Sequence, residues 1–181
     1  MCLRIDKTLH PQLCYGAVPL PFVASDDILV TKMLKHTKKK WLFGKDKFET
    51  PFMVEQVKFD RNGMAVLADQ FSFSKAYSFE SSPSFVDRGI HAFTGVGRDS
   101  TNNIQGSIEC GNVMYSAIIP KGTEFYIGNY GDIVAEKIII FSSVKAYLNY
   151  VDKNGRPERF EPKNHELLDA EKYREQELSN A

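Results

Sequence analysis

The chain has 181 residues, about the length of one domain, and 43% of them are hydrophobic while 25% are charged. These proportions are typical of globular proteins and exclude wholesale disorder. The 23 basic residues balance the 23 acidic ones, so no overall charge attracts the protein to nucleic acid or to a membrane surface. The longest uninterrupted apolar run, Met64 to Ala68, is too short for a transmembrane helix. The N-terminus lacks the apolar stretch of a signal peptide, so we expect a cytoplasmic protein.

The cysteine content argues against both disulfides and a metal site. The three cysteines, Cys2, Cys14 and Cys110, are an odd number at wide spacing, which does not form a disulfide framework. With His10, two of them make at most a three-ligand cluster, whereas structural zinc takes four ligands. We therefore expect reduced thiols, no metal and no cofactor.

Charge is distributed unevenly along the chain although the total cancels. Residues Lys32 to Lys47 contain seven lysines and one acidic residue, Asp46, for a net charge of +6. The segment Met64 to Val144 carries a net charge of −3, and the tail from Asp152 carries −2. The lysines beside Trp41 resemble a nucleic-acid patch, but a solvated hairpin tip is the stronger interpretation because the rest of the protein is acidic. We therefore expect no nucleic-acid partner.

Residues 1–26 are expected to form an irregular arm that packs on the body of the protein. Three prolines exclude a long helix there, and several apolar side chains indicate that the arm lies across the body. A single domain, residues 27–162, follows and begins with a strand at Asp27–Leu34, which is rich in β-branched residues. Two further strands are expected at Trp41–Phe43 and Phe52–Phe59.

In the middle of the chain, turn signals separate short apolar segments. The Asn-Gly pair of Asp60–Gly63 predicts a turn, and Met64–Ala68 fits either a strand or a short helix. Gly89–Phe93 is a short predicted strand. The alternating pattern of Asn112–Ile119 predicts a longer strand, and Glu124–Ile127 is its expected partner, because the Pro-Lys-Gly-Thr segment between them favours a tight turn.

The last third of the chain is expected to supply two strands and one helix. Ile133–Phe141 is the longest apolar strand, and Val144–Val151 is the last strand. Within the C-terminal residues 163–181, Asn164–Leu178 has a capping residue and a thin apolar stripe, which predict a helix. Many short strands and little helix predict an α+β fold with a mainly antiparallel sheet. Edge strands of such a sheet invite pairing, so we expect that a homo-oligomer can form.

His91 is the first candidate for chemistry. It lies on the predicted strand Gly89–Phe93, between apolar residues that point to the opposite face. One interpretation is a half-buried histidine that is bonded to the backbone. The other is a cleft residue that donates a hydrogen bond to a ribose or phosphate, or that carries a proton near neutral pH.

Two tyrosines and a glutamate form a second group of candidates. Tyr126 and Tyr130 bracket a turn with two glycines, and aromatic rings beside exposed main-chain N–H groups suit a flat base and a phosphate. A plain glycine turn with packed tyrosines fits the same pattern. Glu136 interrupts an apolar strand, so it either faces solvent at a strand end, as the adjacent Lys137 favours, or faces a cleft and binds a ribose hydroxyl.

Three cations complete the candidate set. Arg88 precedes the His91 strand, Arg98 follows a Gly-Val-Gly segment whose N–H groups could hold an anion, and Lys121 lies in the turn after Asn112–Ile119. The sequence contains no phosphate-binding loop, dinucleotide fingerprint or nucleophile elbow. The predicted ligand-binding residues are therefore Arg88, His91, Arg98, Lys121, Tyr126, Tyr130 and Glu136.

Four segments, taken in order, resemble a group of small uncharacterised proteins from bacteria and their phages. The segments are Asp27–Lys32, Gly89–Phe93, Ala117–Tyr126 and Asp132–Ile138. The shared motifs are G-[FIL]-H-x-[FY] and I-P-K-G-x-x-[FY]-Y, and the resemblance spans residues 27–141. It implies a phage or mobile-element context.

A fainter resemblance is to ADP-ribosyltransferases. Those enzymes carry a histidine or arginine on an early strand, a middle tyrosine or serine motif and a late glutamate, and His91, Tyr126 and Glu136 occur here in that order. The resemblance implies that His91 positions the ribose of NAD and that Glu136 stabilises the developing oxocarbenium charge.

Three functional hypotheses follow from these observations. The first is a non-catalytic phage protein that sequesters a nucleotide-derived small molecule, such as a defence signal, in the host cytoplasm. The second is an ADP-ribosyltransferase-like enzyme that acts on NAD through His91 and Glu136. The third is a protein-interaction module that docks through Lys32–Lys47 or through the C-terminal helix. The lack of a complete catalytic set favours a binding protein over an enzyme.

Overall fold

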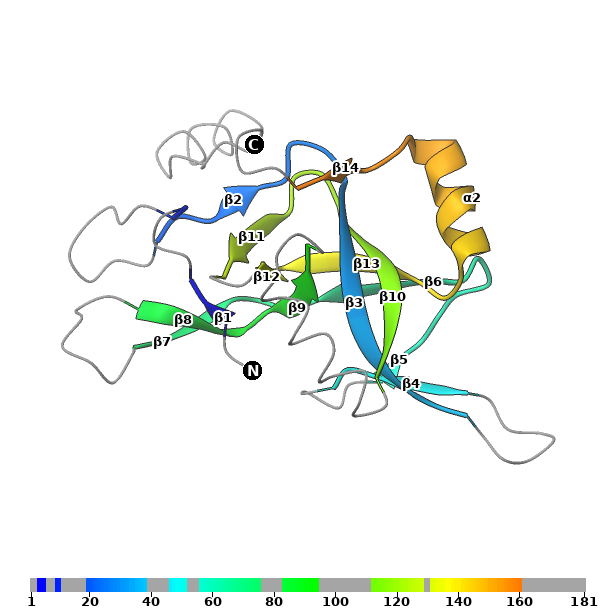
Figure 1. The fold of residues 1–181 in the computed structure, drawn as a ribbon, viewed down its shortest axis with the longest axis horizontal. Coiled ribbons are helices and arrows are strands. Elements are labelled where there is room, and N and C mark those ends of the chain that lie inside the picture. The colour runs from blue at the N-terminus through cyan, green and yellow to red at the C-terminus, as the bar shows by residue number, and fades with distance from the viewer. Residues whose placement is uncertain are drawn as a thin grey trace, which may run out of the picture.

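The computed structural model describes residues 3–5, 9–10, 19–38, 46–51, 56–75, 83–94, 112–128 and 131–160. Within these residues, almost all strand pairs are antiparallel and one helix is present, which confirms the predicted α+β fold with a mainly antiparallel sheet (Figure 1). No helix in the described part of the chain is long and apolar enough to cross a membrane.

An eleven-stranded sheet forms the body of the protein. Its main path of paired neighbours is β2 (Phe22–Val23), β11 (Glu124–Ile127), β12 (Asp132–Ala135), β9 (Ile90–Phe93), β3 (Ile28–Thr37), β10 (Asn112–Ile119), β13 (Lys137–Phe141) and β6 (Met64–Ala68). Three short strands pair off this path, namely β4 (Lys47–Glu49), β5 (Gln56–Val57) and β14 (Glu158–Arg159). Of these, β14 runs parallel to β3.

The main sheet folds over on itself around a single apolar cluster. Strand β3 pairs with β10 along most of its length, whereas β13 registers against β10 only near Ile118, where the strand direction turns (Figure 1). Side chains from both ends of the strand order, such as Phe125 of β11 and Ile138 of β13, therefore meet in one buried cluster. This cluster is the largest part of the core, and the surface of the sheet that faces away from it is the outer face.

A three-stranded sheet covers part of the outer face. Its strands are β1 (Leu3–Arg4), β8 (Pro83–Arg88) and β7 (Ser72–Lys75), with β8 in the centre. Buried side chains of both sheets, among them Leu3, Val86, Tyr126 and Val134, form a second apolar cluster. The described parts of the N-terminal arm thus contribute to the core, because Leu3, Ile5 and Phe22 are all buried.

Helix α2 (Val144–Asn154) packs on another part of the outer face, against Ile118 and Phe141. The Ser143 hydroxyl caps the helix by accepting a hydrogen bond from the Ala146 N–H at 3.2 Å. At the other end, Gly155 has a φ of 90°, and its N–H donates to the Val151 carbonyl at 2.9 Å.

The strand predicted over Val144–Val151 is wrong, because this segment is helix α2. Its valine and tyrosine residues favour strands by propensity, but Ala146 and Tyr150 lie four residues apart and share the face that packs on the sheet. The Ser143 cap and this spacing are the local signals of a helix.

Two predicted pairings also differ from the structure. Glu124–Ile127 was expected to pair with Asn112–Ile119, but β11 pairs with β12 and β2 instead, so the Pro-Lys-Gly-Thr turn leads the chain away from β10. The single strand expected over Ile133–Phe141 is two strands, β12 and β13, separated at Glu136. The two halves have different partners, since β12 pairs with β9 and β13 pairs with β10 and β6.

The remaining strand predictions have mixed outcomes. Strands over Asp27–Leu34, Gly89–Phe93 and Asn112–Ile119 are confirmed with small changes at their ends. Met64–Ala68 is a strand, and within Phe52–Phe59 only Gln56–Val57 is a described strand. The strand expected at 41–43 and the helix expected at 164–178 lie outside the described residues, as do residues 52–55.

Candidate functional site

Gly89 brings two of the predicted site residues together. It joins β8 of the small sheet to β9 of the main sheet with a φ of 125°, a conformation that favours glycine. A Cβ at this position would collide with the side chain of Val134, so the close approach also requires glycine. Ile90 pairs with Ala135, the last residue of β12. Arg88, two residues before Ile90, therefore lies near this end of β12, where Glu136 follows.

Arg88 and Glu136 line the same hollow, whose volume is about 610 Å³. We call it the Arg88–Glu136 hollow. Strand β6 and the residues after it supply one wall, and the break between β12 and β13 supplies another. The hollow is lined by Ala68, Asp69, Gln70, Arg88, Glu136 and Lys137.

Asp69 anchors one side of this hollow. Its N–H donates to the Glu136 carbonyl at 2.9 Å, and its carboxylate accepts from Arg88 Nη2 at 3.0 Å. The Arg88 side chain remains 58% exposed, so this ion pair contributes little to stability. A guanidinium has five N–H donors, and the ion pair therefore leaves donors of Arg88 open to a ligand.

Glu136 is the most unusual group in the hollow. Its residue is half-buried, and its carboxylate has no hydrogen-bond or ion-pair partner among the described residues. Burial raises the pKa of Glu136 above its ordinary value, because a desolvated carboxylate is less stable when charged. The Glu136 oxygens are not among the buried side-chain atoms that lack a partner, so the carboxylate reaches the hollow and can accept a hydrogen bond from a ligand there.

His91 lines a different and much smaller cavity. Its volume is about 20 Å³, close to the size of one water molecule, and it is also lined by Lys32 and Asp132. The Lys32 ammonium donates to the His91 carbonyl, and His91 Nε2 is buried without a hydrogen-bond partner among the described residues. Burial, and then the charge of Lys32, lower the pKa of His91 to about 4, so the imidazole is neutral near pH 7. His91 is therefore poorly suited to transfer a proton near neutral pH.

Tyr126 lies in the core between the two sheets. Its ring is 3% exposed and packs edge-to-face against Phe71 and Phe73. Its hydroxyl donates to the Pro19 carbonyl at 2.8 Å, which ties the N-terminal arm to β11. Burial raises the pKa of the Tyr126 phenol, and the charges of Glu124 and Glu136 raise it further. Tyr126 does not line the Arg88–Glu136 hollow.

Lys121 lies in the exposed turn between β10 and β11 and does not line the Arg88–Glu136 hollow. Its ammonium is 3.4 Å from the Asp26 carboxylate, and its N–H donates to Asp27 Oδ1 at 3.0 Å. Asp27 in turn accepts from the Tyr150 hydroxyl at 2.6 Å, so this group joins the turn, the start of β3 and helix α2. The other two predicted site residues, Arg98 and Tyr130, lie outside the described residues.

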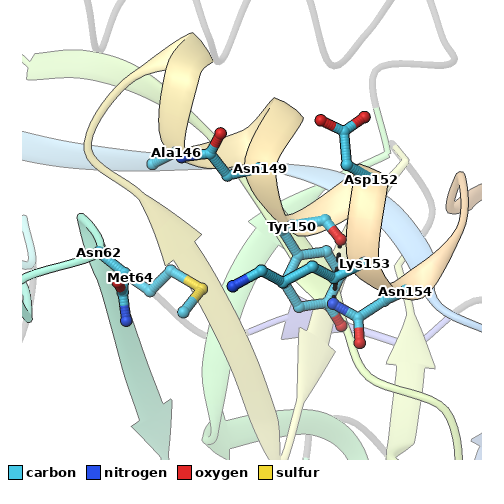
Figure 2. A pocket seen from close by; sticks show the side chains of 8 residues that line it. All are labelled: Asn62, Met64, Ala146, Asn149, Tyr150, Asp152, Lys153 and Asn154. Carbon is cyan, nitrogen blue, oxygen red and sulfur yellow. Dashed lines mark hydrogen bonds between the residues drawn. The ribbon is translucent and has the colours of Figure 1, made fainter.

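A second large hollow, of about 450 Å³, lies between helix α2 and the start of β6 (Figure 2). Tyr150 and Met64 form its apolar part, and polar side chains from the helix and from the preceding turn surround them. Asn154 donates to the Tyr150 carbonyl at 3.0 Å. The lining residues are Asn62, Met64, Ala146, Asn149, Tyr150, Asp152, Lys153 and Asn154. The sequence did not reveal this hollow, because Val144–Val151 was predicted to be a strand and is part of helix α2.

His10 is a further residue whose role the sequence analysis missed. The residue is fully buried, its Nδ1 lies 2.9 Å from the Leu20 carbonyl, and its Nε2 accepts from the Ile127 N–H at 2.9 Å. The Nε2 contact therefore ties the arm to β11, and the Nδ1 contact links two parts of the arm. Cys2 and Cys14, considered with His10 as a metal cluster, lie outside the described residues.

Comparison of the chain with models of protein families, with curated proteins and with solved structures gives no match.

Proposed function

We propose that this protein binds a small nucleotide-like molecule in the Arg88–Glu136 hollow and does not transform it. The observation that carries the proposal is the unpaired, half-buried carboxylate of Glu136 beside a guanidinium with open donors. A carboxylate accepts hydrogen bonds from the hydroxyls of a ribose, while Arg88 and the adjacent Lys137 suit a phosphate. A ligand of this kind pairs with both the free carboxylate acceptor of Glu136 and the open donors of Arg88.

The geometry favours binding over catalysis. Group transfer from NAD needs an acid, a base or a nucleophile within hydrogen-bond reach of the reacting atom. The ADP-ribosyltransferase hypothesis places His91 and Glu136 on one NAD molecule, yet the two residues line separate cavities. A buried imidazole with a pKa of about 4 is also poorly placed to bind a ribose or a phosphate at the surface.

The resemblance to small bacterial and phage proteins supports a role for this binding in a host cell. A phage or mobile-element protein that captures a nucleotide-derived defence signal in the host cytoplasm requires tight binding without turnover. A hollow with polar anchors and no catalytic set is compatible with that requirement.

A thermal-shift screen against NAD, ADP-ribose, cyclic ADP-ribose isomers and cyclic nucleotides tests the proposal, with mass spectrometry of each ligand afterwards. A ligand present at 100 times its Kd adds about 2.7 kcal/mol of stability, or roughly 5–10 °C in Tm at this chain length. We expect a shift with recovery of the intact ligand. A chemically altered ligand would show an enzyme instead, and no shift with any of these compounds would contradict the proposal.

Paired variants locate the site. Each of Arg88→Gln and Glu136→Gln should weaken ligand binding about tenfold or more, because each removes a charge-assisted hydrogen bond. Arg159→Gln is the matched control, since it removes an exposed cation on β14, outside the hollow. The shift is measured against the Tm of each free variant, so that a loss of stability is not mistaken for a loss of binding. Equal weakening in all three variants would exclude this hollow as the site.

A further inference from the structure

Strand β6 forms one end of the main sheet and is poorly protected for an edge strand. Among the described strands it pairs only with β13, and its residues Met64–Ala68 include no charge, no proline and no register shift. Edge strands of natural proteins usually carry one of these features, because unpaired main-chain groups invite pairing with another strand. Val66, at the centre of β6, is 59% exposed.

The hydrogen bonds at the two ends of β6 show which main-chain groups point outward. Ser142 N–H donates to the Gly63 carbonyl at 2.8 Å, and Asp69 N–H donates to the Glu136 carbonyl at 2.9 Å. In an antiparallel pair, alternate residues bond to the partner strand, so odd-numbered residues from 63 to 69 bond toward β13. The even-numbered residues 64, 66 and 68 direct their N–H and C=O groups away from the sheet.

Only two of these three outward residues remain open. The Met64 N–H donates to Asp60 Oδ1, and the Met64 carbonyl accepts from the Asp60 N–H, both at 2.8 Å. The main-chain groups of Met64, the first residue of β6, are therefore already bonded to the preceding turn. Val66 and Ala68 present main-chain donors and acceptors that no described residue engages.

We propose that two copies of the chain pair through β6, antiparallel, about a two-fold axis at Leu67. In this register Val66 faces Ala68 of the partner subunit, and Ala68 faces the partner's Val66, which makes four main-chain hydrogen bonds. An axis at Val66 would place Ala68 opposite Met64 of the partner subunit, whose main-chain groups are already bonded to Asp60. Only two main-chain hydrogen bonds, between the two copies of Val66, would then form. An axis at Ala68 would need the Gln70 N–H, which donates to the Asp69 carboxylate at 2.9 Å.

The side chains of β6 also fit a second copy of the same strand. Leu67 packs against the core cluster and is partly exposed at the sheet edge, and the axis places it opposite Leu67 of the partner subunit. Such a non-hydrogen-bonded pair brings apolar side chains into contact. No like charges meet across the axis, because Met64–Ala68 carries none. A single uncharged strand of this pattern is thus complementary to itself, and the pairing does not require the proposed ligand.

Sedimentation velocity over a wide range of protein concentration tests this pairing. We expect the wild type to shift from monomer to dimer as concentration rises, and Val66→Lys to remain a monomer with unchanged circular dichroism. Leu148→Lys is the matched control, because Leu148 is 52% exposed on helix α2 rather than at the edge of a strand, and this variant should still dimerise. A wild type that is monomeric throughout, or a dimer that Val66→Lys leaves intact, would overturn the proposal.

A cysteine substitution tests the register even if Val66→Lys does not fold. Residues that face each other at a non-hydrogen-bonded position have a Cα separation that a disulfide can span. Leu67→Cys should therefore form a disulfide-linked dimer under mild oxidation, beyond any that the wild type forms through its three native cysteines. Ala65→Cys, two residues from the axis, should not. Cross-linking of Ala65→Cys in place of Leu67→Cys would exclude this register.

Discussion

The neutral imidazole of the half-buried His91 makes the stability of the protein depend on pH. In the unfolded chain the imidazole has its ordinary pKa of 6.5, whereas burial and Lys32 lower the pKa to about 4 in the folded protein. Between these values the unfolded state binds more protons than the folded state, so the free energy of unfolding rises with pH. The contribution is fully present above about pH 6.5 and is lost as pH falls toward 4. Its size is about 3 kcal/mol, since each pKa unit corresponds to 1.36 kcal/mol.

The test is urea unfolding of the wild type and of His91→Gln at a series of pH values between 7 and 4. We expect the wild type to lose about 3 kcal/mol more than the variant across this range, because glutamine does not titrate. Val134→Ala is the control, since Val134 is fully buried on β12 and pairs with His91. It should lower stability by a similar amount at every pH. If the difference between wild type and His91→Gln does not change with pH, His91 is not the buried neutral group described here.

Substitutions at three further positions test the contacts that organise the fold, each measured by urea unfolding. Gly89→Ala should cost about 3 kcal/mol or more, because it strains the positive φ and collides with Val134, and a smaller loss would mean that the turn can relax. Tyr126→Phe should cost about 1 kcal/mol by leaving the Pro19 carbonyl without its donor, and an unchanged stability would argue that water replaces the hydroxyl. Ser143→Ala should cost about 1 kcal/mol by removing the helix cap, while Ser143→Gly should cost less, and equal losses would contradict a capping role.

Local sequence patterns predicted the strands more successfully than their partners. The alternation in Asn112–Ile119 identifies β10, because the alternate residues Tyr115, Ala117 and Ile119 face the core cluster. The Asn-Gly pair identifies the turn before β6. The local sequence does not show which strand pairs with Glu124–Ile127. The Pro-Lys-Gly-Thr turn is compatible with a hairpin and also with a chain that turns away from β10 to pair elsewhere. The long-range pairing of β11 with β2 decides between the two, and no local signal shows that pairing.

The error at Val144–Val151 has a different cause. Valine and tyrosine favour strands by propensity, but tertiary packing overrides propensity when one helix face can be buried. Tyr150 contributes to this packing through its ring contact with Phe141 and its hydrogen bond to Asp27. The Ser143 cap was the available signal, and it lies directly before the segment.

The sequence placed Arg88 and Glu136 in one predicted set of ligand-binding residues, but it did not show which members of that set would lie together. Arg88 and Glu136 were both expected to bind a ligand, and the structure brings them into one hollow. What joins them is the register of β9 with β12 and the turn at Gly89, which depend on residues far apart in the sequence. His91 follows the same turn but lies on a paired strand, so it is buried in a separate cavity.

The position of Glu136 explains why a carboxylate can remain unpaired in this sheet. Within a strand, neighbouring strands cover both edges and the core covers one face, so a charge there is expensive without a partner. Glu136 lies between β12 and β13, where the chain changes partners, and its main-chain groups are satisfied by Glu124 and Asp69 while its side chain meets the hollow. At this break between strands, both main-chain groups of Glu136 are hydrogen-bonded while its carboxylate remains accessible. In this chain the charged residue inside the long apolar run accordingly marks the point where the run divides into two strands.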